Sequence, residues 1–313
     1  TITTVGALTV NIGLGMRANF NSTTSPITRG RSVTTLEDLS TTVDGPIKLV
    51  SLAGSLTIDG GSDSVGVSAG GSGDVLIESR GADSDVIIDG DVVSGSGNIT
   101  LDAANDLTVN AAVSTAGSGV VYLVAGNDVS VNDSLTTVAG DILVDAALNL
   151  TQNAVITSGS GNVGLIAGGS LAQTSSGDIT TGGDVLLEAG NAWTMAGDAV
   201  ITATGNVVGH VLSGDATLGL INATNVGLTA SGSIVDGNDE SLNVSSTTLS
   251  LVSETGLIGG ADSLNGNADQ NVNALDIAVE SLAASSDSGI YISEIDDLMI
   301  TFVDAVSVDI DSV

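Results

Sequence analysis

Residues 140–163 read GDILVDAALNLTQNAVITSGSGNV, and residues 183–207 read GDVLLEAGNAWTMAGDAVITATGNV. Both segments open with Gly-Asp, continue through alternating apolar residues to a small-residue turn, and close with Ile-Thr and Gly-Asn. Similarity of this kind at a fixed distance is typical of repeat proteins, in which each repeat forms one structural unit. The period of the repeat therefore decides the fold.

Seven glycines open successive units at nearly equal intervals along the chain. They are Gly73, Gly97, Gly119, Gly140, Gly161, Gly183 and Gly205. Apolar residues follow at the second and fourth positions after the glycine, as Val75 and Ile77 do after Gly73. A spacing of two predicts a strand with one buried face.

Each unit contains two further short strands. Pairs such as Leu107 with Val109 mark the second strand, and an apolar residue followed by a hydroxyl, as in Ile156-Thr157, marks the third. We place Trp193 in the buried column of the second strand, together with Leu107, Val129 and Leu148. Corners such as residues 126–128 carry Gly, Asn and Asp, which tolerate left-handed backbone conformations. The sequence therefore predicts an all-β fold, a parallel β-helix with about 22 residues and three short strands per coil.

The period divides the chain into three parts. Residues 45–225 form the regular solenoid, and residues 226–313 form less regular coils with inserts at their corners and an acidic end. Residues 1–44 do not follow the pattern, so we expect a non-repeat arm or cap there that takes part in assembly.

Composition excludes several classes of function. Lys and Arg total 5 against 37 Asp and Glu, which gives a formal net charge of -32. Nucleic acids and anionic membranes would be repelled by this charge, so neither is an expected partner. The sequence contains no run of eighteen apolar residues, so no membrane-spanning helix is expected. The chain has no cysteine, which excludes disulfides and thiolate chemistry.

Units of the form Gly-Asp/Asn-Val-x-Leu-x-Ala, followed by Gly-Asn and Ile-Thr, resemble the repeat bodies of bacterial filamentous-haemagglutinin-type exoproteins and related giant surface proteins. Residues 289–298, GIYISEIDDL, also resemble a segment of such repeat arrays. The resemblance covers residues 45–313. It implies a secreted, right-handed parallel β-helix at the cell surface that serves in adhesion or as the shaft of a fibre.

The sequence does not favour a catalytic site, and we expect that the protein is not an enzyme. Polysaccharide lyases of this architecture need clustered basic residues, but the solenoid offers only Lys48 and Arg80. Glycosidases need two carboxylates a fixed distance apart, for which Asp296 with Asp297 or Asp83 with Asp85 are the candidate pairs. Adjacent residues of a strand point to opposite faces, so Asp296 and Asp297 diverge unless they lie in a corner. His210, the only histidine, has no partner at a recognisable spacing and is expected to face solvent.

Calcium is the one cofactor that the sequence suggests, and none is required. Asp236, Asn238, Asp239 and Glu240 crowd one insert and carry the oxygen ligands that calcium prefers. A looser group comprises Asp83, Asp85 and Asp89. A plain solvated acidic face remains the alternative for both groups.

The outward column of the first strand is more apolar than a solvated sheet should be. It reads Leu76, Thr100, Tyr122, Leu143, Gly164, Leu186 and Val208. We therefore expect this flank to be covered, either by the arm or by another copy of the chain.

These observations favour an extracellular structural protein that assembles head to tail as part of a bacterial surface fibre. A neutral arm that carries three arginines and an acidic end are complementary in charge, and exposed strand edges favour pairing with another chain. The residues assigned to assembly are Arg17, Arg29, Arg31, Asp296, Asp297, Asp304, Asp309 and Asp311. The alternative is the shaft of an adhesin that binds a host, cell-surface or glycan ligand, and a polysaccharide-degrading β-helix enzyme ranks third.

Overall fold

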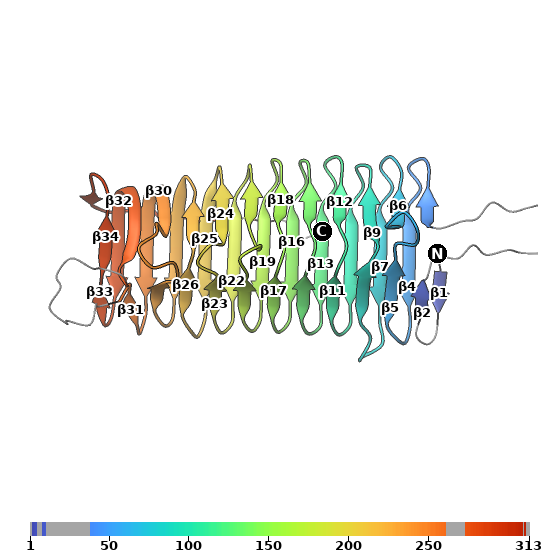
Figure 1. Ribbon diagram of the computed structural model, residues 1–313, viewed down its shortest axis with the longest axis horizontal. Coiled ribbons are helices and arrows are strands. Elements are labelled where there is room, and N and C mark those ends of the chain that lie inside the picture. The colour runs from blue at the N-terminus through green and yellow to red at the C-terminus, as the bar shows by residue number, and fades with distance from the viewer. Residues whose placement is uncertain (1, 5–7, 11–37, 261–272, 309, 311–313) are drawn as a thin grey trace, which may run out of the picture.

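The computed structural model describes residues 2–4, 8–10, 38–260, 273–308 and 310. Within these ranges every regular element is a β-strand, and the strands stack into an elongated solenoid with three strands per coil (Figure 1). The all-β fold and the parallel β-helix are thus confirmed. No helix long and apolar enough to cross a bilayer occurs in the described ranges.

The first face is formed by the longest strand of each regular coil. Its strands are β1 (Ile2–Thr4), β4 (Ile47–Ser51), β7 (Val75–Ser79), β10 (Ile99–Ala103), β13 (Val121–Ala125), β16 (Ile142–Ala146), β19 (Val163–Ala167), β22 (Val185–Ala189), β25 (Asn206–Val211), β28 (Asn225–Ala230) and β35 (Met299–Ile300). All of their pairings are parallel, and Ile99 of β10 pairs with Val121 of β13, its counterpart one repeat later. The predicted period is therefore confirmed.

The second face is a separate 12-stranded parallel sheet. It comprises β2 (Leu8–Val10), β5 (Leu56–Asp59), β8 (Val86–Asp89), β11 (Leu107–Val109), β14 (Val129–Val131), β17 (Leu150–Gln152), β20 (Leu171–Gln173), β23 (Trp193–Met195), β26 (Ala216–Leu218), β29 (Ile234–Asp236), β31 (Leu257–Ile258) and β33 (Gly289–Ile290). Neighbouring strands in this sheet come from successive coils.

The third face lies between the second face and the first face of the next coil. It comprises β3 (Leu39–Thr41), β6 (Val65–Ala69), β9 (Asp91–Ser94), β12 (Val113–Thr115), β15 (Leu135–Thr137), β18 (Ile156–Ser158), β21 (Ile179–Thr181), β24 (Val200–Ala203), β27 (Leu220–Asn222) and β34 (Ile292–Glu294). Two long strands, β30 (Val244–Ser253) and β32 (Leu275–Ser286), pair with both the third and the first face. These two strands join the two faces into one sheet near the carboxyl end.

The core is a column of alternating side chains from all three faces. In β10, Ile99, Leu101 and Ala103 point inward and are buried, and the residues between them are partly exposed. Trp193 is 1% exposed and fills the interior of the second face as predicted. The predicted place of Leu148 in this column is wrong, because Leu150 pairs with Val129. Leu148 lies in the preceding corner and is 49% exposed.

The glycines that open the units are needed for close stacking. A Cβ at Gly119 would collide with the carbonyl oxygen of Gly97, and one at Gly140 with that of Gly119. The Gly, Asn and Asp of the corners at residues 104–106, 126–128 and 190–191 do not adopt the left-handed conformation that they tolerate, because none of these residues has a positive φ. Gly126 instead provides room for the carbonyl of Ala104 in the coil before it.

Three strands of the amino-terminal part pair with the solenoid, although the sequence shows no repeat there. β1 pairs with β4, β2 with β5 and β3 with β6, all in parallel. The register joins Ile2 to Leu49 but Leu39 to Val67, so the separation of paired residues along the chain shrinks within one coil. This change of spacing is the reason that periodicity does not reveal the coil.

Candidate functional site

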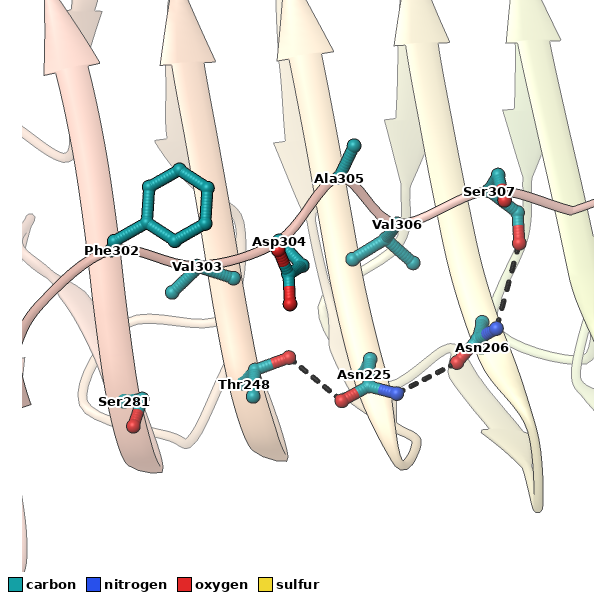
Figure 2. A pocket seen from close by; sticks show the side chains of 10 residues that line it. All are labelled: Asn206, Asn225, Thr248, Ser281, Phe302, Val303, Asp304, Ala305, Val306 and Ser307. Atoms are coloured by element: carbon teal, nitrogen blue, oxygen red, sulfur yellow. Dashed lines mark hydrogen bonds between the residues drawn. The ribbon is translucent and has the colours of Figure 1, made fainter.

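The chain leaves the solenoid after β35 and turns back across the outside of the first face. Figure 2 shows residues 302–307 passing over neighbouring strands of the shaft. We call residues 301–310 the C-terminal strap, of which residue 309 lies outside the described part of the chain. The strap places side chains from the end of the sequence over coils formed by much earlier residues, among them β19 and β28.

Two glycines on the outer surface of the first face receive apolar side chains of the strap. A Cβ at Gly227, in β28, would lie 3.0 Å from Cβ of Val306. A Cβ at Gly164, in β19, would lie 3.0 Å from Cδ1 of Ile310. The missing side chains at these positions therefore form two seats for the strap.

The strap alternates like a strand with one face against the shaft. Val306, Val308 and Ile310 are half-buried, whereas Ala305 and Ser307 are exposed. Apolar residues at every second position place their side chains on one side of an extended chain. Extended backbone advances about 3.4 Å per residue, so four residues span about 14 Å. Three coil steps of about 4.8 Å from β28 to β19 cover the same distance.

The strap covers part of the apolar outward column of the first face, around Leu143 and Gly164. The sequence predicts a cover from the arm or from another copy, and the structure instead places a segment of the same chain there. Leu143 points outward beside Gly164 and the Cδ1 atom of Ile310, and it is only 6% exposed. The strap thus covers part of this flank, and cover of the rest by the arm or by another copy stays a prediction.

A polar groove of about 350 Å³ lies between the strap and the corner that precedes the first face (Figure 2). Oγ1 of Thr248 donates to Oδ1 of Asn225 at 2.7 Å, and Nδ2 of Asn225 donates to Oδ1 of Asn206 at 2.9 Å. Nδ2 of Asn206 donates to the carbonyl oxygen of Ser307 at 3.5 Å, which is a weak contact. Asp304 lies over this ladder in Figure 2.

A second hollow of about 330 Å³ lies on the same outer face, further along these strands and on the other side of the strap. It is lined by Glu188, His210 and Thr229, which occupy one outward column, and by Ala305 and Val306 of the strap. His210 faces outward as expected, but the strap and the neighbouring coils leave it half-buried. Glu188 and His210 are register partners in adjacent strands.

Burial raises the pKa values of two outward-facing acids, Asp102 and Asp145, which lie in the amino-terminal half of the first face. Partial burial raises the pKa of Asp102, and the charge of Glu78 raises it further, while Arg80 opposes the shift. Burial also raises the pKa of Asp145. The pKa of Tyr122 is raised first by burial and then by these two carboxylates. Arg80 binds Glu78, its Nη2 donating to Oε2 at 2.9 Å.

Many of the remaining acids are structural. Oδ1 of Asp85 accepts hydrogen bonds from Nδ2 of Asn105 and from the backbone N–H of Asp106. Oδ1 of Asp106 does the same for Asn127 and Asp128 one coil later. Two of the acids that the sequence offers as calcium ligands, Asp85 and Asp89, thus bind the next coil.

The insert with the predicted calcium ligands brings two of the four together. Nδ2 of the buried Asn243 donates to Oδ1 of Asp236 at 2.9 Å and to Oδ1 of Asn238 at 2.7 Å. Asp239 and Glu240 are exposed and do not join this contact. In the described ranges no three Asp, Glu or His side chains are arranged to hold a metal. Calcium binding at the insert therefore stays a prediction.

Asn243 is a residue that sequence reasoning missed. It is fully buried, and its side chain also accepts from the backbone N–H of Asp276. Oδ2 of Asp276 is buried without a hydrogen-bond partner, and burial raises the pKa of this carboxyl. Nothing in the repeat pattern marks Asn243, because it lies in an insert that occurs once.

The residues assigned to assembly are only partly within the described chain. Asp296 and Asp297 are exposed in the turn between β34 and β35, and Asp304 is exposed in the strap. Arg17, Arg29, Arg31, Asp309 and Asp311 lie outside the described residues. The charge complementarity between the two ends therefore stays a prediction.

Comparison of the chain with protein-family models, with curated proteins and with solved structures finds no match. The solenoid agrees with the fold that the resemblance to haemagglutinin-type repeat bodies implies. Membership of that family is not shown.

Proposed function

We propose that the chain is an extracellular structural β-solenoid, a subunit or segment of a bacterial surface fibre that assembles head to tail and has no catalytic activity. The resemblance of the repeat supports the extracellular location, and the parallel coils support the role of a rigid shaft. Assembly is supported by the composition of the carboxyl end.

The last coils expose large apolar side chains, which an end of the shaft surrounded only by water would not require. Of the twelve large apolar side chains that are exposed among the described residues, six lie between residues 290 and 302. They are Ile290, Tyr291, Ile295, Met299, Ile300 and Phe302. A concentrated apolar patch favours contact with another protein surface. This patch is the observation that carries the proposal.

In the described part of the chain, no further strand pairs with the outer edges of the strands at the two ends of the shaft. Among the described residues, β33, β34 and β35 pair only with strands of preceding coils, and β1, β2 and β3 only with strands of the following coil. Unpaired edges of this kind are templates for addition of a strand from another chain. The described residues of the strap run along the side of the shaft and do not pair with β33, β34 or β35.

Electron microscopy and sedimentation test the proposal. The double variant I295E/I300E places two charges on the apolar end, and L148E/L212E places two charges at exposed apolar positions within the shaft. We expect fibres from the wild-type chain and from L148E/L212E, and single particles from I295E/I300E. Single particles from the wild-type chain at high concentration would contradict the proposal.

The polar groove supports a second candidate, the shaft of an adhesin that binds a glycan. Hydroxyl, amide and carboxylate groups of Thr248, Asn225 and Asp304 line it, and Phe302 at its edge is 82% exposed. Sugars are bound by such polar groups combined with an aromatic surface. A glycan array distinguishes the candidates, because a pure shaft binds no glycan and an F302A/D304A variant should abolish binding through this groove.

A further inference from the structure

The C-terminal strap is held by a small number of specific contacts. Val306 and Ile310 occupy the seats at Gly227 and Gly164. Among the described residues of the strap, its backbone makes two hydrogen bonds to the shaft, from the N–H of Thr301 to the carbonyl oxygen of Leu282 at 3.2 Å and from Nδ2 of Asn206 to the carbonyl oxygen of Ser307 at 3.5 Å. Hollows of about 350 and 330 Å³ lie on its two sides, so packing beside the seats is incomplete. Contacts of this kind fix the position of the strap on the first face but bind it only weakly.

The solenoid does not depend on the strap for its strand pairing. Residues 301–308 belong to no strand, and β35 pairs with β32 before the strap begins. Thr301, Phe302, Asp304 and Ala305 are exposed and connect the last coil to the first seat. Release of residues 306–310 therefore breaks the seat contacts and leaves the coils intact.

The seats select an extended segment with apolar residues at alternate positions. The spacing of the two glycines along the shaft matches the spacing of Val306 and Ile310 along an extended chain. A second copy of this chain carries the same segment and would make the same contacts. Exchange of an identical element needs no new complementary surface, which makes it a low-cost route to dimers.

We propose that the outer surface of the first face is a docking groove for an extended apolar segment, and that residues 306–310 of a second copy replace the chain's own residues 306–310 there at high protein concentration. The five connecting residues, Thr301–Ala305, reach up to about 17 Å when fully extended, which limits how far the seat of the second copy can lie from the last coil. The net charge of -32 opposes the approach of two copies, and screening over about 8 Å at physiological salt weakens this repulsion.

The chain has no cysteine, which makes a disulfide test direct. Full-length Gly227→Cys and full-length Val306→Cys are mixed in equal amounts under oxidising conditions and separated on a non-reducing gel. Exchange brings Cys at 306 of one copy beside Cys at 227 of the other. The control mixes Gly227→Cys with Ser307→Cys, because Ser307 is exposed and its side of the strap faces away from the seat.

We expect the Gly227→Cys and Val306→Cys mixture to give about tenfold more mixed dimer than the control, which corresponds to about 1.4 kcal/mol of preference for the seat. The yield should rise with protein concentration and with salt, because salt screens repulsion between the acidic shafts. The pair Gly164→Cys and Ile310→Cys, tested in the same way, examines the second seat independently.

Two results would overturn the proposal. Mixed dimer at the level of the control for both seats, while the double variant G227C/V306C closes within one chain, would show that the strap never leaves its own shaft. Failure of G227C/V306C and of G164C/I310C to close at low concentration would show that the seats are wrong. Neither result bears on head-to-tail assembly, which uses the ends of the shaft.

Discussion

A chain of buried polar side chains inside the second face gives the sharpest test of the packing. Gln173 is 2% exposed, its Nε2 donates to Oε1 of Gln152 at 3.0 Å and to the carbonyl of Gly177 at 3.2 Å, and its Oε1 accepts from Nε1 of Trp193 at 2.9 Å. Gln173→Leu keeps a similar volume and leaves three buried polar groups without this partner. Each such group costs about 1–3 kcal/mol.

The expected net effect is a loss of stability. The three groups together cost about 3–9 kcal/mol and burial of the leucine side chain returns about 1.5–3 kcal/mol, so Gln173→Leu should lower the free energy of unfolding by about 1.5–6 kcal/mol. The double variant Q152L/Q173L should cost at least about 1 kcal/mol less than the sum of the two single variants, because the unpaired Oε1 of Gln152 is then also removed. Ala172→Thr is the control, since residue 172 faces outward in the same strand, between Thr151 and Thr194.

Urea unfolding followed by fluorescence measures these differences directly. The chain has a single tryptophan, and Trp193 is itself a member of the buried chain. Its emission reports the environment of the ladder before unfolding and the loss of burial during unfolding. A Gln173→Leu variant as stable as the wild-type chain, or strict additivity of the two single variants, would refute this account of the interior.

Three further perturbations have expected outcomes in the same unfolding assay. Burial raises the pKa of Asp145 in the folded state, so the contribution of this carboxyl to stability is present at low pH and lost as pH rises through that pKa. Asp145→Asn should therefore stabilise the chain at pH 7 and not at pH 3. The control Asp287→Asn, at an exposed position, should not change stability at either pH. Gly140→Ala places a Cβ against backbone and should cost about 2 kcal/mol or more, whereas Gly227→Ala meets only a side chain of the strap and should cost less. Asp106→Ala removes the acceptor for two donors of the next corner and should cost about 1–2 kcal/mol.

Periodicity predicts the parts of this fold that recur, and fails where a feature occurs once. The strands of residues 73–211 follow from apolar residues at alternate positions, because every coil must bury the same columns. The error at Leu148 arises because Leu148 and Leu150 both fit an alternating pattern, and only the position of the corner separates them. The pairing of β1, β2 and β3 with the shaft is hidden by the changing separation along the chain between the paired residues.

The candidate site was partly visible in the sequence. Val306, Val308 and Ile310 alternate with polar residues, and the apolar outward column of the first face predicts a cover. The sequence does not say that these two features belong together, because the distance along the chain between the strap and its seats follows no period. Gly164 and Gly227 interrupt the outward column and have no explanation until the strap is placed over them.

The acidic composition has a structural explanation that redirects the search for function. Stacked carboxylates at corners such as Asp85 and Asp106 are about 5 Å apart, and their repulsion in water is about 0.8 kcal/mol. Hydrogen bonds from the next coil to a charged acceptor contribute about 1.5–3 kcal/mol, so each step of the ladder is favourable despite the repulsion. These acids are therefore accounted for by the shaft itself. The features that the shaft does not need are the apolar end and the glycine seats, and recognition is expected there.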